Sequence, residues 1–387
     1  MNPKFALHAE TLFDTLADLV SINSVNPSLP GGPGESAIAT YIGNYFAKHS
    51  IPHQFQTVFE GRPNVIARLE GEPGGSTLVL EAHMDTASTT CMTRDPFLPE
   101  RQGNRLYGRG SCDTKGGLAA MIHVLRTLRE TAVRRRATVI FVGTVDEEFG
   151  MRGAAKFVEG NGKADGAIVA EPTDLNTVVA SKGILRWQLR VKGRAAHSSK
   201  PGLGISAITK MAKVLTAIEE RFPAIFAQRY HPLLGSPTIT VGVIRGGVQV
   251  NQVPDSCLVD IDRRLIPGET QETVWQDFER LIAELRAADR DLNVVMEPPT
   301  FANGPLETTT AHRIVQVVCK VSSGLRGPRE VVGVPFGSDA TALADAGIPC
   351  IILGPGSVDQ AHAEEEYVDL DQVAAAAEIY AGAALEF

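Results

Sequence analysis

Two kinds of hydrophobic pattern alternate along the first half of the chain. Short apolar runs rich in β-branched residues occupy residues 77–80, 138–142 and 167–169, and each has the length of a buried strand. Residues 117–128 lie between two of these runs, and their apolar positions repeat with the period of a helix. The alternation predicts an α/β fold, with a largely parallel sheet and helices on its faces.

The pattern changes in the middle of the chain. Residues 185–191 alternate like a half-buried strand, residues 207–222 have helical periodicity, and residues 238–244 and 257–261 again have the character of strands. Strands and helices mixed in this way favour a separate α+β domain, which we place at residues 181–293.

The α/β pattern resumes towards the carboxyl end. A helical stretch covers residues 312–321, an apolar run covers residues 350–353, and an alanine-rich helix begins near Asp371. A chain of 387 residues also exceeds what a single core usually holds. We therefore expect one domain built from residues 1–180 and 294–387, interrupted by the inserted domain.

Composition and charge exclude several classes of function. Hydrophobic residues make up 43% of the chain and charged residues 21%, values typical of a globular protein. The formal net charge is −8, and the densest basic cluster is only residues 134–136, which we interpret as a solvated loop. Nucleic acid is therefore not an expected partner. No apolar run approaches 18 residues, so a membrane is not expected either.

The cysteines indicate a reducing compartment. They are odd in number and scattered, without the CxxC spacing of a thiolate metal site. Residues 1–20 have an acidic amphipathic pattern and lack the apolar segment of a signal peptide. We therefore expect a cytoplasmic protein. The cysteines are Cys91, Cys112, Cys257, Cys319 and Cys350.

Candidate metal ligands follow the predicted strands or lie in glycine-rich loops. An open α/β sheet gathers its site at the carboxyl edge of the strands, so these side chains should converge. Oxygen ligands combined with imidazole suit zinc, with cobalt or manganese as substitutes. Two metals sharing one carboxylate would acidify a water between them and polarise a scissile carbonyl. The candidates are His83, Asp113, Glu148, Glu171 and His362.

Each candidate also has a simpler interpretation when taken alone. A histidine after a strand, such as His83, is more often structural than a ligand, and Asp113 precedes a helix that it could simply cap. The adjacent Glu147 and Glu148 could belong to an ordinary acidic loop. Their side chains must diverge, however, which suits Glu148 as a metal ligand and Glu147 as a proton acceptor. Asp85 follows His83 at a spacing that lets its carboxylate support the imidazole.

Taken together, the motifs resemble a family of two-zinc amidohydrolases and metallo-exopeptidases. That family contains acetylornithine deacetylase, succinyl-diaminopimelate desuccinylase, aminoacylases and related metallo-carboxypeptidases. The match comprises HMD at residues 83–85, GRGSCDTKGG at 108–117, DEE at 146–148, EP at 171–172 and AH at 361–362, in the family's order. It implies a zinc-exopeptidase-like catalytic domain with a mixed, mainly parallel sheet, interrupted by an α+β, ferredoxin-like dimerisation domain.

The resemblance also implies roles for individual residues. His83 and Glu171 would bind one zinc, Glu148 and His362 the other, and Asp113 both. Glu147 would be the general base, with Asp85 behind His83, and a cis peptide would follow Asp113.

Further residues match the family's substrate positions. His197, in RAAHSS, would reach the active site of the partner subunit in a homodimer and stabilise the oxyanion. Contacts to the substrate are expected from Asn251, Arg264, Ser338 and Gly356. An arginine suits a carboxylate because its planar fork binds bidentately, although Arg264 could instead form an ion pair with Asp262 or Asp260.

The substrate is the least determined part of the prediction. Residues 354–362 most resemble acetylornithine deacetylases, which indicates an N-acyl amino acid, N-acetylornithine, as the small-molecule partner. The GSDA sequence at residues 337–340 is as reminiscent of the desuccinylases, and Cys112 stands where alanine is common. A desuccinylase, a metallo-exopeptidase acting on dipeptides and a metal-free binding protein remain alternatives.

Overall fold

The computed structural model describes residues 8–161, 163–328 and 330–387, which form two compact units. The first comprises Met1–Val179, Thr308–Val332 and Ser338–Phe387, and the second Ala180–Glu307 and Gly333–Gly337. The second unit extends past the predicted residue 293 to Glu307, because two later strands pair with a strand near its start. Of the amphipathic segment predicted over residues 1–20, residues 1–7 lie outside the described part of the chain.

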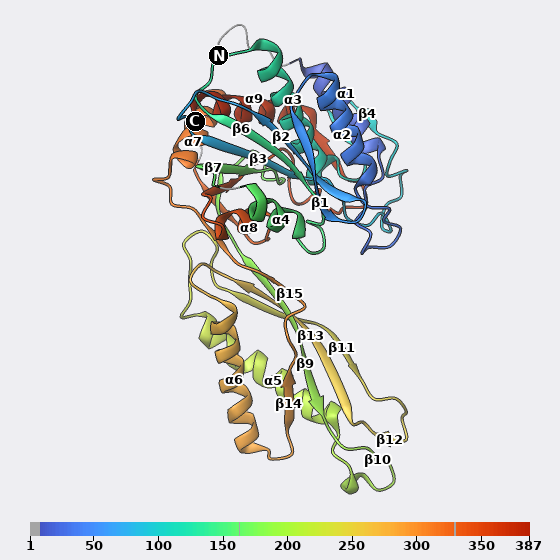
Figure 1. Ribbon diagram of the computed structural model, residues 1–387. Helices are drawn as coiled ribbons and strands as arrows, with labels where there is room; N and C mark the ends of the chain where they lie inside the picture. Colours follow the sequence, from blue (N-terminus) through green and yellow to red (C-terminus); the bar gives the residue numbers. More distant parts are fainter. Residues whose placement is uncertain (1–7, 162, 329) are drawn as a thin grey trace. The chain divides into compact units, whose positions relative to one another are not determined.

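Most of a nine-stranded mixed sheet forms the centre of the first unit (Figure 1), although its short edge strand β16 falls within the residues of the second. Its order is β1-β2-β6-β3-β7-β18-β8-β16, with β17 also pairing with β8. The pairs β6–β3, β3–β7 and β7–β18 are parallel, whereas β1–β2, β2–β6, β18–β8 and β8–β16 are antiparallel. The parallel character predicted from the sequence is thus confined to the four central strands. The strands are β1 (His53–Phe59), β2 (Arg62–Leu69), β3 (Thr77–His83), β6 (Thr138–Thr144), β7 (Gly166–Val169), β8 (Val178–Ser181), β16 (Leu306–Glu307), β17 (Val332–Val334) and β18 (Cys350–Ile352).

Helices cover both faces of this sheet. Five helices share one large apolar core with the sheet, whereas α4 and α8 lie next to each other outside that core (Figure 1). A small sheet has the order β19-β5-β4; β4 and β5 come before α3 in the sequence, and β19 directly precedes α9. The helices of the large core are α1 (Ala9–Ser21), α2 (Ser36–Lys48), α3 (Gly116–Thr131), α7 (Arg313–Arg326) and α9 (Leu370–Glu386). The remaining elements are α4 (Arg152–Asn161), α8 (Ala340–Asp345), β4 (Glu100–Gln102), β5 (Arg105–Tyr107), β19 (Tyr367–Asp369) and the helical turn Ser111–Lys115.

Strand β3 shows how the sheet presents polar side chains at its edge. Leu78, Leu80 and Ala82 belong to the large apolar core. Successive side chains of a strand point to opposite faces, so Glu81 and His83 lie on the other face. Because the central strands are parallel, their carboxyl ends meet at one edge, and His83 is the last residue of β3 there.

The second unit has the βαββαβ order of a ferredoxin-like fold. Its antiparallel sheet runs β11-β13-β9-β14, with β15 also pairing with β9. Trp187 of this sheet contacts Trp275 and Phe278 of α6 with ring centroids 5.3 and 5.0 Å apart, which anchors the helix on the sheet. The elements are β9 (Gly183–Lys192), β10 (Ala196–His197), the turn Pro201–Leu203, α5 (Ala207–Phe226), β11 (Thr238–Gly246), β12 (Gln252–Val253), β13 (Ser256–Leu265), α6 (Gln271–Ala288), β14 (Asn293–Met296) and β15 (Phe301–Asn303).

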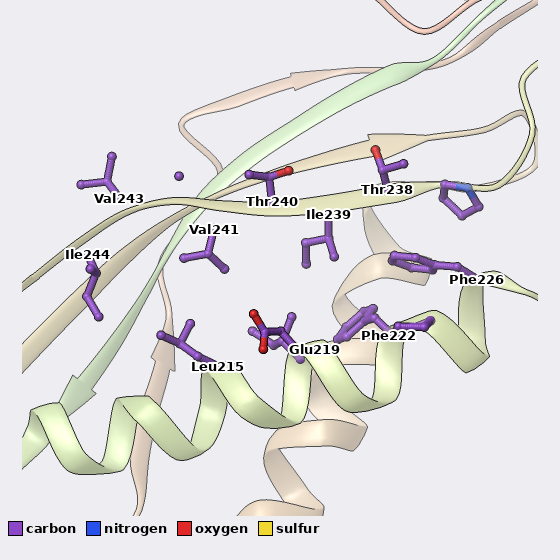
Figure 2. A pocket seen from close by; sticks show the side chains of 14 residues that line it. Leu215, Glu219, Phe222, Phe226, Thr238, Ile239, Thr240, Val241, Val243 and Ile244 are labelled. Carbon is purple, nitrogen blue, oxygen red and sulfur yellow. The ribbon is translucent and has the colours of Figure 1, made fainter.

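An apolar groove of about 780 Å³ lies between α5 and the edge strand β11. Figure 2 shows Phe222 and Phe226 of the helix and Ile239 and Val241 of the strand lining it from opposite sides. Strand β11 is also largely exposed along its length, unlike its neighbour β13, in which buried residues alternate. The groove and the strand together form an apolar edge of the second unit.

The structure also bears on the expected state of the cysteines and on membrane-spanning helices. All five cysteines are free thiols. Within the described ranges, we find no helix with both the length and the hydropathy needed to cross a bilayer.

Candidate metal centre

Six of the predicted residues converge at the carboxyl edge of the central strands. They form two groups in which one potential ligand atom from each residue lies within 4.8 Å of the others. The buried group contains His83, Glu147 and Glu171, and the more exposed group contains Asp113, Glu148 and His362. His83 is the last residue of β3, Asp113 precedes α3, and the other four follow central strands.

The carboxylate of Asp113 connects the two groups. Its Oδ1 atom lies 3.0 Å from Nε2 of His83, and its Oδ2 atom lies 3.4 Å from Nε2 of His362. Glu148 Oε2 is 3.0 Å from the same nitrogen of His362, and Glu171 Oε1 is 3.9 Å from Nε2 of His83. One carboxylate therefore offers one oxygen to each group.

The electrostatics of the buried group favour a bound cation. Burial and the Glu171 charge raise the pKa of Glu147 well above its usual value, and burial and the Asp113 charge do the same for Glu171. Burial opposes a charge on His83, but the hydrogen bond to Asp113 and the surrounding carboxylates outweigh it and raise its pKa. Glu171 Oε1 is buried without a hydrogen-bond partner among the described residues. A divalent cation would relieve this crowding of carboxylates, so the donor set fits a metal.

The exposed group is built on unusual backbone. His362 adopts a φ of +59°, a conformation uncommon for a residue with a side chain. The peptide between Asp113 and Thr114 is cis, as expected. Hydrogen bonds to Asp113 and Glu148 raise the pKa of His362 to about 11, which shows how strongly negative its surroundings are.

Asp85 supports the centre differently from the prediction. The atom nearest Nδ1 of His83 is the backbone carbonyl of Asp85 at 2.9 Å, and the carboxylate Oδ1 is 3.7 Å away. The carboxylate instead accepts the backbone N–H groups of Glu147 and Glu148, each at 3.1 Å. Asp85 thus holds His83 by its main chain and the glutamates by its side chain.

Two supporting residues were missed by the sequence analysis. The buried Asn26 donates to Asp85 Oδ2 at 2.7 Å, and Glu366 accepts the backbone N–H of Asp113 at 3.0 Å. Both lie far from their partners in sequence and within no motif considered above. The only signal for Glu366 was its position four residues after His362.

Comparison with known proteins identifies the family of this chain. The model of peptidase family M20/M25/M40 matches residues 79–386. The chain belongs to this family. A curated relative in the M20 family, the acetylornithine deacetylase of Myxococcus xanthus, is 31% identical over 328 residues, which cover 84% of each chain.

Solved structures show the same fold. The aminopeptidase PepT of Bacillus cereus superposes with a TM-score of 0.78 at 21% identity, covering 98% of this chain and 99% of that one. A dinuclear metal-binding M20 peptidase of Bacillus subtilis gives a TM-score of 0.73 at 16% identity, covering 97% of each chain. The chain described here is therefore an amide hydrolase of this family, and its two groups of ligand atoms fit metal ions.

The predicted oxyanion and substrate residues of this M20 enzyme lie partly in the second unit. His197 and Asn251 line one surface hollow of about 320 Å³ there, and the exposed His197 ring contacts Ser199 Oγ at 2.8 Å. Arg264 donates to Asp262 Oδ1 at 2.7 Å, so the ion pair left open by the sequence is present.

Ser338 and Gly356 lie in the first unit and are buried. The Ser338 hydroxyl oxygen accepts the N–H of Ala340 at 3.3 Å. Gly356 has a φ of +84°, and a side chain there would meet Cys112 Sγ at 2.4 Å. Glycine at this position allows the close approach of two loops, and Cys112 fills the space between them.

Proposed function

We propose that this M20 enzyme removes the acyl group of a small N-acyl amino acid, N-acetylornithine, with two zinc ions. The observation that carries the proposal is the placement of the two Asp113 oxygens against two different histidines, 3.0 Å from His83 and 3.4 Å from His362. The deacetylase name comes from relatives such as the Myxococcus xanthus protein, at 31% identity.

In this proposal each metal position has its own ligands. His83 and Glu171 hold one zinc, Glu148 and His362 hold the other, and Asp113 serves both. Bound zinc would supply a Lewis acid for the amide carbonyl and lower the pKa of water.

Glu147 is the residue proposed to move protons. It is packed in the buried group but is not needed as a ligand if Asp113 serves both positions. Burial and the neighbouring Glu171 charge raise its pKa above that of an ordinary glutamate, the direction that makes a carboxylate a stronger base. Glu147 takes the proton of the attacking water and passes it to the leaving amine.

Residues of the second unit are proposed to bind the rest of the substrate. His197 and Asn251 line the same hollow, which suits donors aimed at the oxyanion and the acyl group. Arg264 offers its guanidinium to the substrate carboxylate, exchanging its contact with Asp262.

The enzyme is proposed to work as a homodimer, in which His197 serves the partner's site. The support is the exposed edge strand β11, flanked by the apolar groove of Figure 2. An edge strand carries unpaired N–H and C=O groups, and pairing with the same strand of a second copy would satisfy them.

The test combines metal analysis with a substrate panel. Metal content is measured by mass spectrometry, and hydrolysis is measured for N-acetylornithine, N-succinyl-diaminopimelate, other N-acyl amino acids and dipeptides, with and without added zinc. We expect two metals per chain and fastest zinc-dependent cleavage of N-acetylornithine. Preference for another substrate would replace the assigned substrate and keep the dinuclear centre, whereas absence of both metal and turnover would favour a binding protein.

A further inference from the structure

A buried ion pair next to the metal centre belongs to no ligand set. Arg109 Nη1 lies 2.6 Å from Glu366 Oε2, and the two side chains are 1% and 0% exposed. Removing two charges from water costs several kcal/mol per ion, so a pair this deeply buried needs good geometry and further hydrogen bonds. The other hydrogen bonds of these two side chains go to the backbone near Asp113 and to Ser88 and Cys91.

On one side, the pair holds the loop of the bridging aspartate. The second oxygen of Glu366, Oε1, accepts the backbone N–H groups of both Cys112 and Asp113, each at 3.0 Å. The backbone carbonyl of Glu366 also accepts the N–H of Gly108 at 3.1 Å. The carboxylate and main chain of one residue thus fix both ends of the segment 108–113.

On the other side, the pair reaches the backbone of His362. Arg109 Nη2 donates to the carbonyl of Ser88 at 2.8 Å and contacts Cys91 Sγ at 3.6 Å. The same Sγ lies 3.6 Å from the backbone carbonyl of His362. Since Glu366 also follows His362 by four residues, the pair ties the two segments together both through space and along the chain.

These contacts serve one metal position more than the other. His83 is the last residue of β3, where it pairs with Thr144 of β6, and Glu171 follows the end of β7 by two residues. His362 lies in a loop, and its side chain is 53% exposed, against 2% for His83. The exposed position therefore depends on side-chain contacts for its geometry.

We propose that the Arg109–Glu366 pair is the positioning element of the exposed metal position and sets its affinity separately from that of the buried position. This inference rests on the proposed dinuclear function. Neither residue touches the substrate or the reacting atoms. Both act through the backbone of Asp113 and His362.

The test measures Zn²⁺ binding to the Glu366→Gln variant and to the wild type. Each metal-free, full-length protein is titrated with Zn²⁺ in a calorimeter. The amide keeps the size of the side chain but places a donor against Arg109 and removes the charge. We expect the first binding step to stay near wild type and the second to weaken by about 10- to 100-fold. Glu269→Gln is the matched control, since it alters the Arg263–Glu269 pair of the second unit, which is also buried.

Arg109→Lys tests the same contact from the other side. Its single ammonium keeps the charge but cannot hold Glu366 and the Ser88 carbonyl together, so the same selective loss is expected. If Glu366→Gln does not fold, Arg109→Lys is used for the same measurement. Equal weakening of both steps, or a second step unchanged in both variants, would overturn the inference while leaving the dinuclear centre intact. Fewer than two sites in the wild-type protein would instead refute the proposed function, and the inference with it.

Discussion

The Oδ1 atom of Asp85 accepts a hydrogen bond from the backbone N–H of Glu147 at 3.1 Å. Oδ2 of the same carboxylate accepts the N–H of Glu148, also at 3.1 Å. The two adjacent glutamates are therefore fixed by their main chain, and their side chains diverge into the buried and the exposed metal group. This arrangement gives the proposed base and the proposed ligand a shared support.

Asn26→Ala should disturb this support. The amide of Asn26 donates to Asp85 at 2.7 Å and to Asp146 at 3.2 Å, and its removal takes one hydrogen-bond donor away from each of these two buried carboxylates. We expect the free energy of unfolding to fall by about 1–3 kcal/mol. We expect kcat to fall roughly 10- to 100-fold. Urea denaturation and steady-state kinetics measure the two effects. Asn23→Ala serves as control, and equal effects of both substitutions would refute the specific role of Asn26.

Glu147→Gln should separate proton transfer from metal binding. We expect kcat to fall by about 10²- to 10⁴-fold because the amide cannot accept a proton, while two metals remain bound. Glu148→Gln is the comparison and should weaken metal binding at the exposed position. Metal analysis decides the role, because loss of one metal equivalent in Glu147→Gln would make Glu147 a ligand of the buried group instead.

His123 should make stability depend on pH. It is buried in α3 with both ring nitrogens unpartnered among the described residues. Burial, then the charge of Arg126, lowers its pKa to about 4, and His49, His8 and Glu130 are the other titratable groups around it. As pH falls from about 6.5 to 4, the unfolded chain binds a proton that the folded protein does not.

The free energy of unfolding should therefore drop across this range, by on the order of 3 kcal/mol from this group. His123→Leu should lose that part of the pH dependence. Urea midpoints of the metal-free proteins at pH 7 and pH 4.5 provide the comparison. Identical pH dependence of wild type and variant would show that His123 titrates normally.

Ile244→Asp should dissociate the proposed dimer. Ile244 is 54% exposed on the edge strand β11, where a second copy would bury it, and a charge there would be desolvated on pairing. Sedimentation should show monomers for this variant and dimers for wild type. Leu98→Asp, at a 66% exposed position of the first unit, should remain dimeric. A monomeric wild type, or a dimeric Ile244→Asp, would refute the interface.

The sequence predicted the fold closely where local patterns carry the information. Strand β6 follows from its continuous apolar run, because it is buried along its whole length, and helix α3 follows from the helical period of its apolar residues. The antiparallel pairing of β1 with β2 and of β2 with β6 was missed, since the direction of pairing depends on partners far along the chain. The extent of the second unit was underestimated for the same reason, because β15 joins it only by pairing with β9.

The sequence predicted those site residues that lie in short recognisable motifs and missed those that do not. His83, Asp113 and His362 lie in short glycine- or strand-flanked motifs, and the structure brings them together. Asn26 and Glu366 act through backbone N–H groups and other side chains, so nothing in their own segments indicates a role. A sequence lists side chains but does not say which of them will meet.

The central position of β18 has a consequence for synthesis. It pairs with β7 on one side and β8 on the other, although about 180 residues separate the end of β7 from its start. At roughly 5–20 residues per second, the ribosome needs on the order of ten to forty seconds to supply it. During that interval the nascent first unit has a gap within its sheet and lacks His362, so the proposed ligand set can be completed only after residue 362 has been synthesised.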